Sequence, residues 1–446
     1  MGTGVCGDRS GRLRVIVIGA GLAGLAAANE LARKVDVVLY EAQPHAGGKA
    51  ASFHINGFTF DTGPHVSFTH DDRIAEMFNR SAGRIHTYTG APVCHFRGGT
   101  IQHPVQCNLI DIEDEALRSE CLVDLVRAQQ NGHTRHHENF ADWCYANLGD
   151  RITEVFQRPY IRKYWTVELE QLSTEWIGPR VYAPDIDQVV DGTIGIRGDD
   201  FYHASHFRYP AEGGFAAFTK DLRTKLAPMV RTGYRVTEIN SKEKTVRFAD
   251  DTTDTYDVLV STMPLPQLIE SIRDTPEEVR AAAAELAWTS HLLVSIMLDV
   301  PDLPIQAPWA YFYEGDIVCS RVHLPHRMSR LNVPPGQCSL QAEIVHSRFR
   351  PLHSNVAAQC VEDLLRVGMI PAGSLILNVD VRDVEFANII YDHNRRAAVA
   401  RVREFLQAAG VHAAGRYGDW ENHWTDGSFL SGERAATNLL KRLLKG

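Results

Sequence analysis

The chain has 446 residues, of which 44% are hydrophobic and 23% are charged, so it is long enough for two or three domains with full cores. Its formal net charge of −9 provides no basic field for nucleic acid or for an anionic membrane surface. The eight cysteines are scattered and form no C-x-x-C pair, which argues against a zinc site or a disulfide framework. We therefore expect an enzyme-sized globular protein that acts on a small molecule and binds no metal.

The first elements of the chain are predicted to be a strand, a glycine turn, a helix and a second strand. Residues 13–19 (LRVIVIG) form a short apolar run, residues 22–33 have the composition of a helix, and residues 36–41 (DVVLYE) form a second apolar run. Asn29 and Glu30 interrupt the apolar stretch around the turn, so it does not read as a membrane span. With no other candidate span, we expect a cytoplasmic protein.

The turn carries the glycine spacing of a dinucleotide-binding motif. Gly19, Gly21 and Gly24 form G-x-G-x-x-G between the predicted strand and helix. The first glycine permits a tight turn, the second lets a pyrophosphate approach, and the third lets the helix pack on the strand. Glu41 follows the second strand, where an acid can bind the ribose hydroxyls.

A second glycine turn follows Glu41, the acid predicted to bind the ribose. This second turn favours FAD over NAD as the expected cofactor. Gly47 and Gly48 are followed by the cation Lys49, a combination suited to the far side of the pyrophosphate that NAD enzymes do not need. The pattern therefore predicts bound FAD.

Two kinds of composition alternate along the rest of the chain. We predict an α/β fold in which a Rossmann-type FAD-binding domain is interleaved with a mixed α+β substrate domain. The FAD-binding domain is expected at 12–67, 210–266 and 411–446, and the substrate domain at 68–209 (helices and loops) and 267–410 (an antiparallel sheet).

The closing segment is predicted to return to the flavin. Gly418 and residues 426–429 are expected to form a loop that leads into a helix at Ser431 and Gly432. Backbone N–H groups at that helix start would stabilise negative charge on the flavin. Together with the strand residue Val236, the candidate contacts with the cofactor from the later segments are Gly418, Asp426, Ser428 and Phe429.

These motifs resemble, over nearly the whole chain, the FAD enzyme superfamily that includes amine oxidases, phytoene desaturases, protoporphyrinogen oxidase and UDP-galactopyranose mutase. The similar stretches are the first glycine motif, GGKA, FDTGPH, YPAEGGFAAFTKDL, VLVSTMP and GRYGDWENHWTDGSFLSGERAA. The resemblance implies an enzyme whose FAD lies between the first and last segments.

The middle segments resemble the UDP-galactopyranose mutases most. The resemblance implies that His65 lies beside the flavin, that one helix supplies Trp176 and Arg180, and that Arg321 comes from a later segment. In the mutases two such arginines bind the substrate diphosphate, which a planar guanidinium can grip in a bidentate way. The chain departs from the mutases at Pro64, where they carry a glycine, and around Asn422, where they carry a tyrosine that binds the substrate phosphate.

Other interpretations of these residues remain open. Arg180 and Arg321 could pair with carboxylates between domains, and His65 could be a packed histidine that satisfies the backbone near its turn. Five tryptophans could form either a stacking surface or part of the core: Trp165, Trp176, Trp309, Trp420 and Trp424.

Two reactions follow from the resemblance. In the first, a small substrate transfers a hydride to flavin N5, and His65 and Arg321 shape the pocket. In the second, reduced flavin N5 attacks the anomeric carbon of a nucleotide sugar while Arg180 and Arg321 hold the diphosphate, without net redox change. A third interpretation, in which the flavin is structural and the chain is a binding module, fits less of the pocket-forming sequence.

Overall fold

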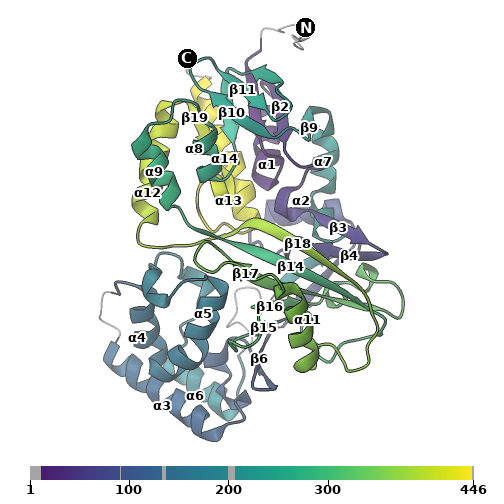
Figure 1. The fold of residues 1–446 in the computed structure, drawn as a ribbon, viewed down its shortest axis with the longest axis vertical. Helices are drawn as coiled ribbons and strands as arrows, with labels where there is room; N and C mark the ends of the chain where they lie inside the picture. Colours follow the sequence, from purple (N-terminus) through teal and green to yellow (C-terminus); the bar gives the residue numbers. More distant parts are fainter. Residues whose placement is uncertain (1–11, 91, 133–136, 199–205, 444–446) are drawn as a thin grey trace.

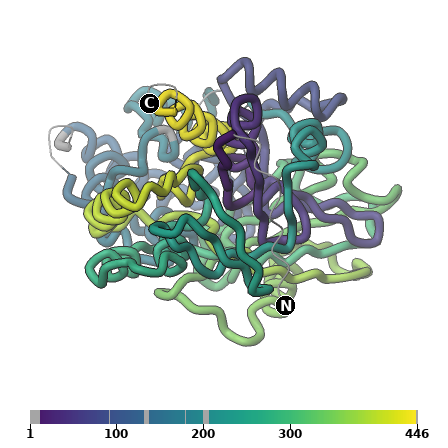
Figure 2. The backbone as a smooth tube through the Cα atoms, turned by 90° about the horizontal axis from the view of Figure 1, so that it is seen from above, coloured from purple at the N-terminus to yellow at the C-terminus, as the bar shows by residue number. Residues whose placement is uncertain are grey.

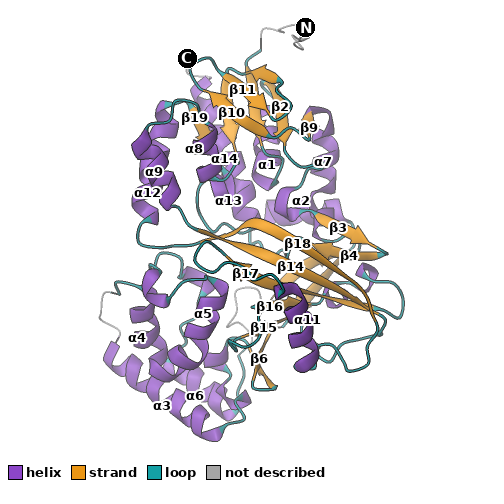
Figure 3. Ribbon diagram, in the orientation of Figure 1, coloured by secondary structure: helices purple, strands orange, loops and turns teal. Residues whose placement is uncertain are grey.

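The computed structural model describes residues 12–90, 92–132, 137–198 and 206–443. Figure 1 shows three layers along the long axis: a nucleotide-binding half at the top, a broad sheet in the middle and a helical group at the bottom. Figure 3 shows that strands dominate the middle layer and helices the bottom one. No helix within the described ranges is long and apolar enough to cross a membrane.

A five-stranded parallel sheet forms the centre of the nucleotide-binding half. Its order is β19-β13-β1-β2-β9, and every neighbouring pair is parallel. The central strand is buried along nearly its whole length because the sheet is covered on both faces. The strands are β1 (Arg14–Ile18), β2 (Asp36–Glu41), β9 (Val230–Thr232), β13 (Val258–Ser261) and β19 (Val411–Ala413).

The strands of this sheet come from three separate parts of the chain. Helix α1 (Leu22–Leu31) connects β1 to β2, as the glycine motif predicts. The last helix, α14 (Thr425–Leu443), packs along α1, and Figure 2 shows this yellow helix beside the purple N-terminal segment. The predicted interleaving of the two domains is therefore confirmed.

Smaller elements complete the nucleotide-binding half. An antiparallel meander and several helices lie around the parallel sheet (Figure 1). They are β10 (Val236–Asn240), β11 (Thr245–Phe248), β12 (Thr253–Thr255), α7 (Lys220–Leu226), α8 (Leu265–Ser271), α9 (Glu277–Glu285), α12 (Arg395–Ala408) and α13 (Gly415–Gly418).

Helices from both ends of the predicted substrate range 267–410 pack against the nucleotide-binding half. Helix α8 contacts β10, and α12 contacts both α9 and β19, so these helices belong with the nucleotide-binding half. Their apolar residues, including Leu268, Val279 and Val402, share one core with β1 and α1. Helical composition alone did not reveal which sheet the helices cover.

The middle layer is a seven-stranded sheet. Its order is β18-β14-β17-β16-β15-β6-β7, and all neighbours are antiparallel except β15 and β6. The strands are β6 (Val93–Phe96), β7 (Gly99–Gln102), β14 (Trp288–Leu298), β15 (Trp309–Phe312), β16 (Arg321–His323), β17 (Cys338–His346) and β18 (Ile376–Ile389). Because β6 and β7 come from the predicted range 68–209, the two substrate ranges share one sheet.

The remaining elements lie outside the two large sheets, and α2 among them contacts α7 of the nucleotide-binding half. The two-stranded pairs are β3 (Ser52–Ile55) with β4 (Phe58–Asp61), and β5 (Ile85–Thr89) with β8 (His206–Pro210). The helices are α2 (Asp72–Ala82), α3 (Glu115–Gly132), α4 (Phe140–Ile152), α5 (Arg158–Tyr164), α6 (Ile186–Ile194), α10 (Pro325–Met328) and α11 (Val356–Arg366).

Two histidines are buried at the end of β16 and in the following helix, His323 in β16 and His326 in α10. Neither ring nitrogen of His323 has a hydrogen-bond partner among the described residues. Burial lowers the pKa of His323 to about 3 and that of His326 to about 4. Both rings are therefore neutral at pH 7.

The burial of His323 predicts acid sensitivity. Between the unfolded pKa of about 6.5 and the folded pKa of about 3, the unfolded chain binds a proton that the folded chain excludes. The free energy of unfolding should therefore fall with decreasing pH by about 1.4 kcal/mol per pH unit for this residue. His323→Phe, measured by urea unfolding at a series of pH values, should lose less stability below pH ~6. The exposed His353→Phe variant should show the same change of unfolding free energy with pH as the wild type. If the curve of His323→Phe also ran parallel to that of the wild type, the assignment of acid sensitivity to His323 would be wrong.

Candidate active site

A single large cavity lies between the carboxyl edge of the parallel sheet and the seven-stranded sheet. Its volume is about 1280 Å³. Residues from β1 to β3, α5, β14 to β18 and the closing segment line it. Ligand sites of open α/β folds are expected at this edge, so we take the cavity as the candidate site.

The first glycine turn forms one wall of the cavity. Gly19 has φ +94°, in the region that favours glycine, and a Cβ on Gly24 would lie 1.8 Å from the Gly19 carbonyl oxygen. Gly21 has an ordinary φ of −74° and begins α1 without a side-chain cap. The N-terminus of α1 therefore faces the cavity with uncapped N–H groups, as a phosphate site requires.

The second glycine turn lies directly opposite the first. A Cβ on Gly48 would lie 2.9 Å from the Gly21 Cα, and Gly48 has φ +55°. Gly47, with φ +127°, donates its N–H to Ala20 O at 2.8 Å. Two side-chain-free backbones thus meet at the helix N-terminus, and this geometry fits the pyrophosphate of a dinucleotide such as FAD.

The acid at the end of β2 is in the cavity wall and organises the loops around it. One carboxylate oxygen of Glu41 accepts the Ala20 N–H at 2.8 Å, and the other accepts the Gln43 N–H at 2.8 Å. Glu41 and the strand residue Val236 both line the cavity. Their predicted contacts with the nucleotide remain predictions.

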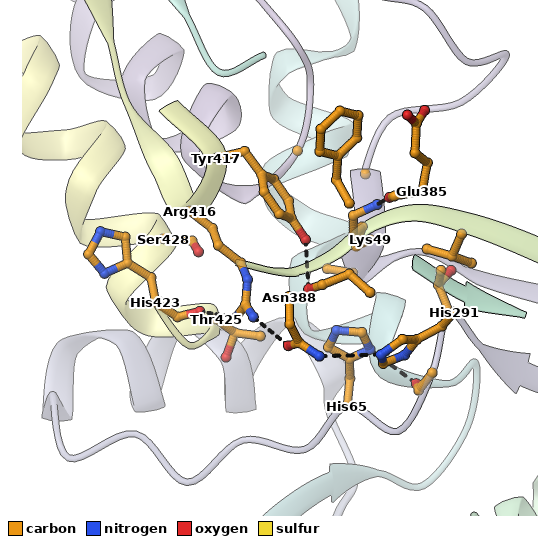
Figure 4. Close-up of a pocket in the computed structure, with 18 of the residues that line it drawn as sticks. Lys49, His65, His291, Glu385, Asn388, Arg416, Tyr417, His423, Thr425 and Ser428 are labelled. Atoms are coloured by element: carbon orange, nitrogen blue, oxygen red, sulfur yellow. Dashed lines mark hydrogen bonds between the residues drawn. The ribbon is translucent and has the colours of Figure 1, made fainter. Parts of the chain in front are cut away.

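Lys49 lines the cavity, but its amine is directed along β18. Nζ donates to Glu385 O at 2.5 Å and lies 5.4 Å from the centre of the Tyr417 ring (Figure 4). Burial and the nearby Arg416 lower the pKa of Lys49 to about 8. The amine therefore lies between β18 and α13, and the structure does not place it against the two glycine turns.

The predicted loop in the closing segment is wrong. Helix α14 begins at Thr425, six residues before the expected start at Ser431. Packing against α1 selects the helix here, because a Cβ on Gly432 would lie 2.0 Å from the Ala23 carbonyl oxygen. Gly427 and Ser428 therefore belong to the first turns of a helix, although they are typical loop residues.

Of the four cofactor contacts predicted in the closing segment, one lines the cavity and three do not. Ser428 lines the cavity, together with Thr425 at the start of α14. Gly418, Asp426 and Phe429 do not line it. Phe429 is buried in the core, and Gly418 packs against β13, where a Cβ would lie 3.3 Å from Ser261 O.

Gly415, Arg416 and Tyr417 of α13, which were not predicted to contact the cofactor, line the cavity instead. Gly415 has φ +83° and packs on Ala23 of α1, while Arg416 and Tyr417 point into the cavity (Figure 4). Tyr417 donates to Ala387 O at 3.1 Å. The arginine directly after a glycine in GRYGDW was the signal that could have identified them.

His65 lies in the cavity wall, and its place beside the flavin remains a prediction. Its Nδ1 lies 3.1 Å from Gly63 O, so this nitrogen carries the proton and Nε2 is an acceptor. The ring packs on Phe215 with a centroid distance of 5.5 Å. Burial lowers the pKa of His65 to about 4, so the ring is neutral at pH 7.

Arg321 lies in the same cavity and pairs with a buried carboxylate. Its Nε donates to Glu343 Oε2 at 2.7 Å, and Glu343 is 1% exposed. Although burial opposes ionisation, Arg321 and His291 hold the pKa of Glu343 well below its usual range. Among the described residues, the two terminal amino groups of Arg321 have no hydrogen-bond partner.

Arg180 approaches the cavity from a different part of the chain. It ends a single 3-10 turn (Gly178–Arg180), so the expected helix carrying Trp176 and Arg180 is wrong, because α5 ends at Tyr164. The Arg180 guanidinium donates to Asn422 O and stacks 4.7 Å from the Trp424 ring centre. The structure therefore brings Arg180 and Arg321 to one cavity.

Aromatic residues form most of the remaining wall on the side of the seven-stranded sheet. Four of the five tryptophans singled out in the sequence line the cavity, whereas Trp420 is fully buried in the core. Trp165 and Trp176 contact edge to face at 5.1 Å. The aromatic lining consists of Tyr160, Tyr164, Trp165, Trp176, Tyr182, Trp309, Tyr311, Tyr313 and Trp424.

The described residues contain no group of three histidine, cysteine, aspartate or glutamate side chains that could hold a metal ion. The seven cysteines within them are free and buried. The polar groups that line the cavity include histidines, arginines, tyrosines, Lys49, carboxylates and the hydroxyls of serines and threonines.

Comparison with known proteins assigns the fold. A family model described as flavin containing amine oxidoreductase matches residues 22–440. A crystal structure of reduced UDP-galactopyranose mutase aligns with a TM-score of 0.91 and 26% sequence identity, over 96% of this chain and 94% of that chain. These matches confirm the predicted resemblance and FAD as the cofactor.

Two further matches are more distant. The structure of cyclohexylamine oxidase from Brevibacterium oxydans IH-35A aligns with a TM-score of 0.67, 15% identity and coverage of 97% of this chain and 99% of that chain, which shows a shared fold. The 4,4'-diapophytoene desaturase (4,4'-diaponeurosporene-forming) of Staphylococcus haemolyticus (strain JCSC1435) is 38% identical over 85 residues, 19% of this chain. The chain thus spans 17% of the length of that relative.

The two opposed glycine turns predict how FAD binding can be removed without loss of the fold. A Cβ on Gly21 would have its nearest neighbour, Gly48 Cα, at 3.9 Å, so Gly21→Val should fold but fill the space that the pyrophosphate needs. We expect the purified variant to lack the flavin absorption of the wild type while its circular dichroism is unchanged.

Two controls test this assignment. Gly315→Ala, at a glycine with open space around it, should retain FAD. Gly24→Ala should fail to fold, because its Cβ would overlap Gly19 O. A yellow, FAD-loaded Gly21→Val protein would show that the pyrophosphate binds elsewhere.

Proposed function

Because this chain belongs to the flavin containing amine oxidoreductase family and is an FAD-dependent enzyme, we propose that it binds a nucleotide sugar by its diphosphate and rearranges the sugar without net redox change. The observation that carries this proposal is the meeting of Arg180 and Arg321 in one aromatic cavity. The alignment with UDP-galactopyranose mutase over nearly both whole chains supports it.

Arg321 has the hydrogen-bond donors that a diphosphate needs. Glu343 occupies only Nε and fixes the plane of the guanidinium, so the two terminal amino groups are available to a ligand. A planar pair of N–H donors matches two phosphate oxygens. Because Glu343 offsets the positive charge of Arg321, the pair offers a ligand directed donors and no net charge.

The Arg180 guanidinium is held by contacts that differ from those of Arg321. Its stacking on Trp424 and its bond to Asn422 O connect it to the segment between α13 and α14. These contacts orient the guanidinium. Arg180 and Arg321 therefore present two oriented guanidinium groups to a cavity that aromatic rings also line.

The aromatic lining has two expected effects on the reaction. Rings such as Trp165 and Tyr311 offer flat apolar faces on which a nucleobase or a sugar can stack. They also exclude water, which strengthens the electrostatic attraction between arginine and phosphate. A reactive sugar would be protected from hydrolysis for the same reason.

FAD supplies, when bound, a ring that accepts a hydride in its oxidised form and acts as a nucleophile in its reduced form. Around it the chain provides neutral His65, whose Nε2 can accept a proton or a hydrogen bond. The N-terminus of α14, which enters the cavity at Thr425 and Ser428, favours negative charge nearby. These groups would support either chemistry.

A second candidate function is oxidation of a small substrate by hydride transfer to the flavin. The family model and the amine oxidase and desaturase matches favour it. In that case the arginines would shape the pocket and would not bind phosphate.

One titration separates the two candidates. The FAD-loaded protein is photoreduced without oxygen, and the reduced and oxidised forms are titrated with UDP and a panel of nucleotide sugars. Binding to the reduced form without flavin reoxidation supports the rearrangement. Absence of nucleotide binding, with bleaching of the oxidised flavin by an amine, alcohol or alkene, supports hydride transfer.

Substitutions of the two arginines test the proposal directly. Arg180→Ala and Arg321→Lys should each weaken UDP binding by about 1.5–3 kcal/mol, the scale of a charged hydrogen bond. Lysine is used at 321 so that Glu343 does not become an unpaired buried charge. Isothermal titration calorimetry of the FAD-loaded variants measures the change.

Arg33→Ala is the matched control, because that side chain is 64% exposed and forms only a loose 3.7 Å contact with Glu30. Its affinity for UDP should equal that of the wild type. If Arg180→Ala and Arg321→Lys both retain wild-type affinity, the diphosphate role of the arginines is wrong.

A further inference from the structure

A chain of buried polar side chains connects the closing segment with Arg321. Its first part is visible in Figure 4, where Arg416, Asn388 and His291 follow one another along the cavity. Arg416 Nη2 donates to Asn388 Oδ1 at 2.7 Å. Asn388 Nδ2 lies 3.3 Å from His291 Nε2.

The second part of the chain continues from His291 into the seven-stranded sheet. His291 Nδ1 lies 3.4 Å from Glu343 Oε1, and Glu343 Oε2 accepts the Arg321 Nε–H at 2.7 Å. His291, Asn388 and Glu343 are each less than a tenth exposed. Water can therefore replace few of these contacts.

From this arrangement we infer that His291 is a positioning residue. It is held as the neutral tautomer with its proton on Nδ1, and together with Arg321 it orients the Glu343 carboxylate. This role deepens the proposed function, on which it rests, because Arg321 is the residue proposed to bind the diphosphate. His291 itself does not touch the substrate in this assignment.

The direction of each hydrogen bond follows from the first one. A guanidinium only donates, so the Asn388 atom that faces Arg416 is the carbonyl oxygen. The amide nitrogen of Asn388 must then donate to His291 Nε2, which therefore carries a lone pair. A neutral imidazole has one N–H, and it is left on Nδ1, directed at Glu343.

The backbone supports this alignment at an irregular point of the sheet. Strand β14 pairs with β18 as Thr289 with Asn388 and as His291 with Val384, so the register shifts between these pairs. Phe386, within the shifted stretch, has φ +57°. Such a bulge redirects side chains, and here Asn388 is brought between Arg416 and His291.

The charged groups around His291 come from several elements. Glu343 lies on β17, Arg321 on β16 and Arg416 on α13, while neutral His65 lies on the loop after β4. Protonation of His291 Nε2 would place its N–H against the Asn388 amide N–H. Asn388 would then have to turn its amide toward Arg416, which also only donates.

The tautomer can be measured without any ligand. In the FAD-loaded protein with ¹⁵N-labelled histidine, two-bond ¹H–¹⁵N spectra distinguish a protonated from an unprotonated ring nitrogen, and the loss of one signal set in His291→Gln assigns residue 291. We expect the unprotonated nitrogen to be Nε2. A proton on Nε2 in the wild type would overturn the inference.

Asn388→Asp is the variant that changes the hydrogen bonding of His291 with little change of shape. Its carboxylate can accept from Arg416 and from His291 but cannot donate, so Nε2 should become protonated while Nδ1 keeps its proton toward Glu343. An unchanged Nδ1–H tautomer in a folded, FAD-loaded Asn388→Asp protein would show that Asn388 does not set the proton position, which contradicts the inference.

The positioning role is tested by UDP affinity. His291→Leu should weaken UDP binding about tenfold, because Glu343 loses a donor and Arg321 loses its fixed orientation. His291→Gln, whose amide offers one donor and one acceptor, should recover most of the affinity. Equal affinities for the wild type and His291→Leu would overturn the role, and the exposed His353→Leu serves as control.

The two measurements separate this inference from the proposed function. If the wild type binds no UDP, the proposed function fails, and the tautomer spectrum still decides whether His291 is held as described. If UDP binds but the proton lies on Nε2, the inference alone fails.

Discussion

The structure depends on close contact between α1 and α14, the first and last long helices of the described chain. A Cβ on Gly432 would lie 2.0 Å from Ala23 O, and a Cβ on Gly415 would lie 2.7 Å from the Ala23 Cβ. Ser431 Oγ adds a hydrogen bond from the Gly415 N–H at 2.8 Å. Backbones that approach so closely leave little freedom of position, so the glycine turn at Gly21 and the closing segment are fixed relative to each other.

The cavity follows from this contact. The parallel sheet supplies the glycine turns, the seven-stranded sheet supplies Arg321 and Glu343, and the closing segment between them supplies Arg416. Arg321 and Glu343, which face the cavity from the seven-stranded sheet, are paired, so their orientation is determined before a ligand arrives. Such preorganisation lowers the entropy lost on binding.

The sequence allowed the Rossmann unit and the interleaving to be predicted, because these depend on local patterns such as G-x-G-x-x-G between a strand and a helix. His65, Arg180 and Arg321 were selected through the resemblance to the mutases, and all three line the cavity. His291, Asn388 and Glu343 depend on strand register and on a bulge, which no local pattern encodes. An acid within the apolar run SLQAEIV was the one available signal for Glu343. The start of α14 was missed because its packing on α1 overrides the loop preference of Gly427 and Ser428.

The interleaving of the two domains also couples the cofactor site to the substrate cavity. Helix α14 spans Thr425–Leu443, and the cavity wall formed by Arg416, Tyr417 and Ser428 lies within the same closing segment. Detachment of this segment from α1 would therefore open the cavity beside the glycine turns. Bound FAD and a bound substrate should for that reason both stabilise the contact between α1 and α14.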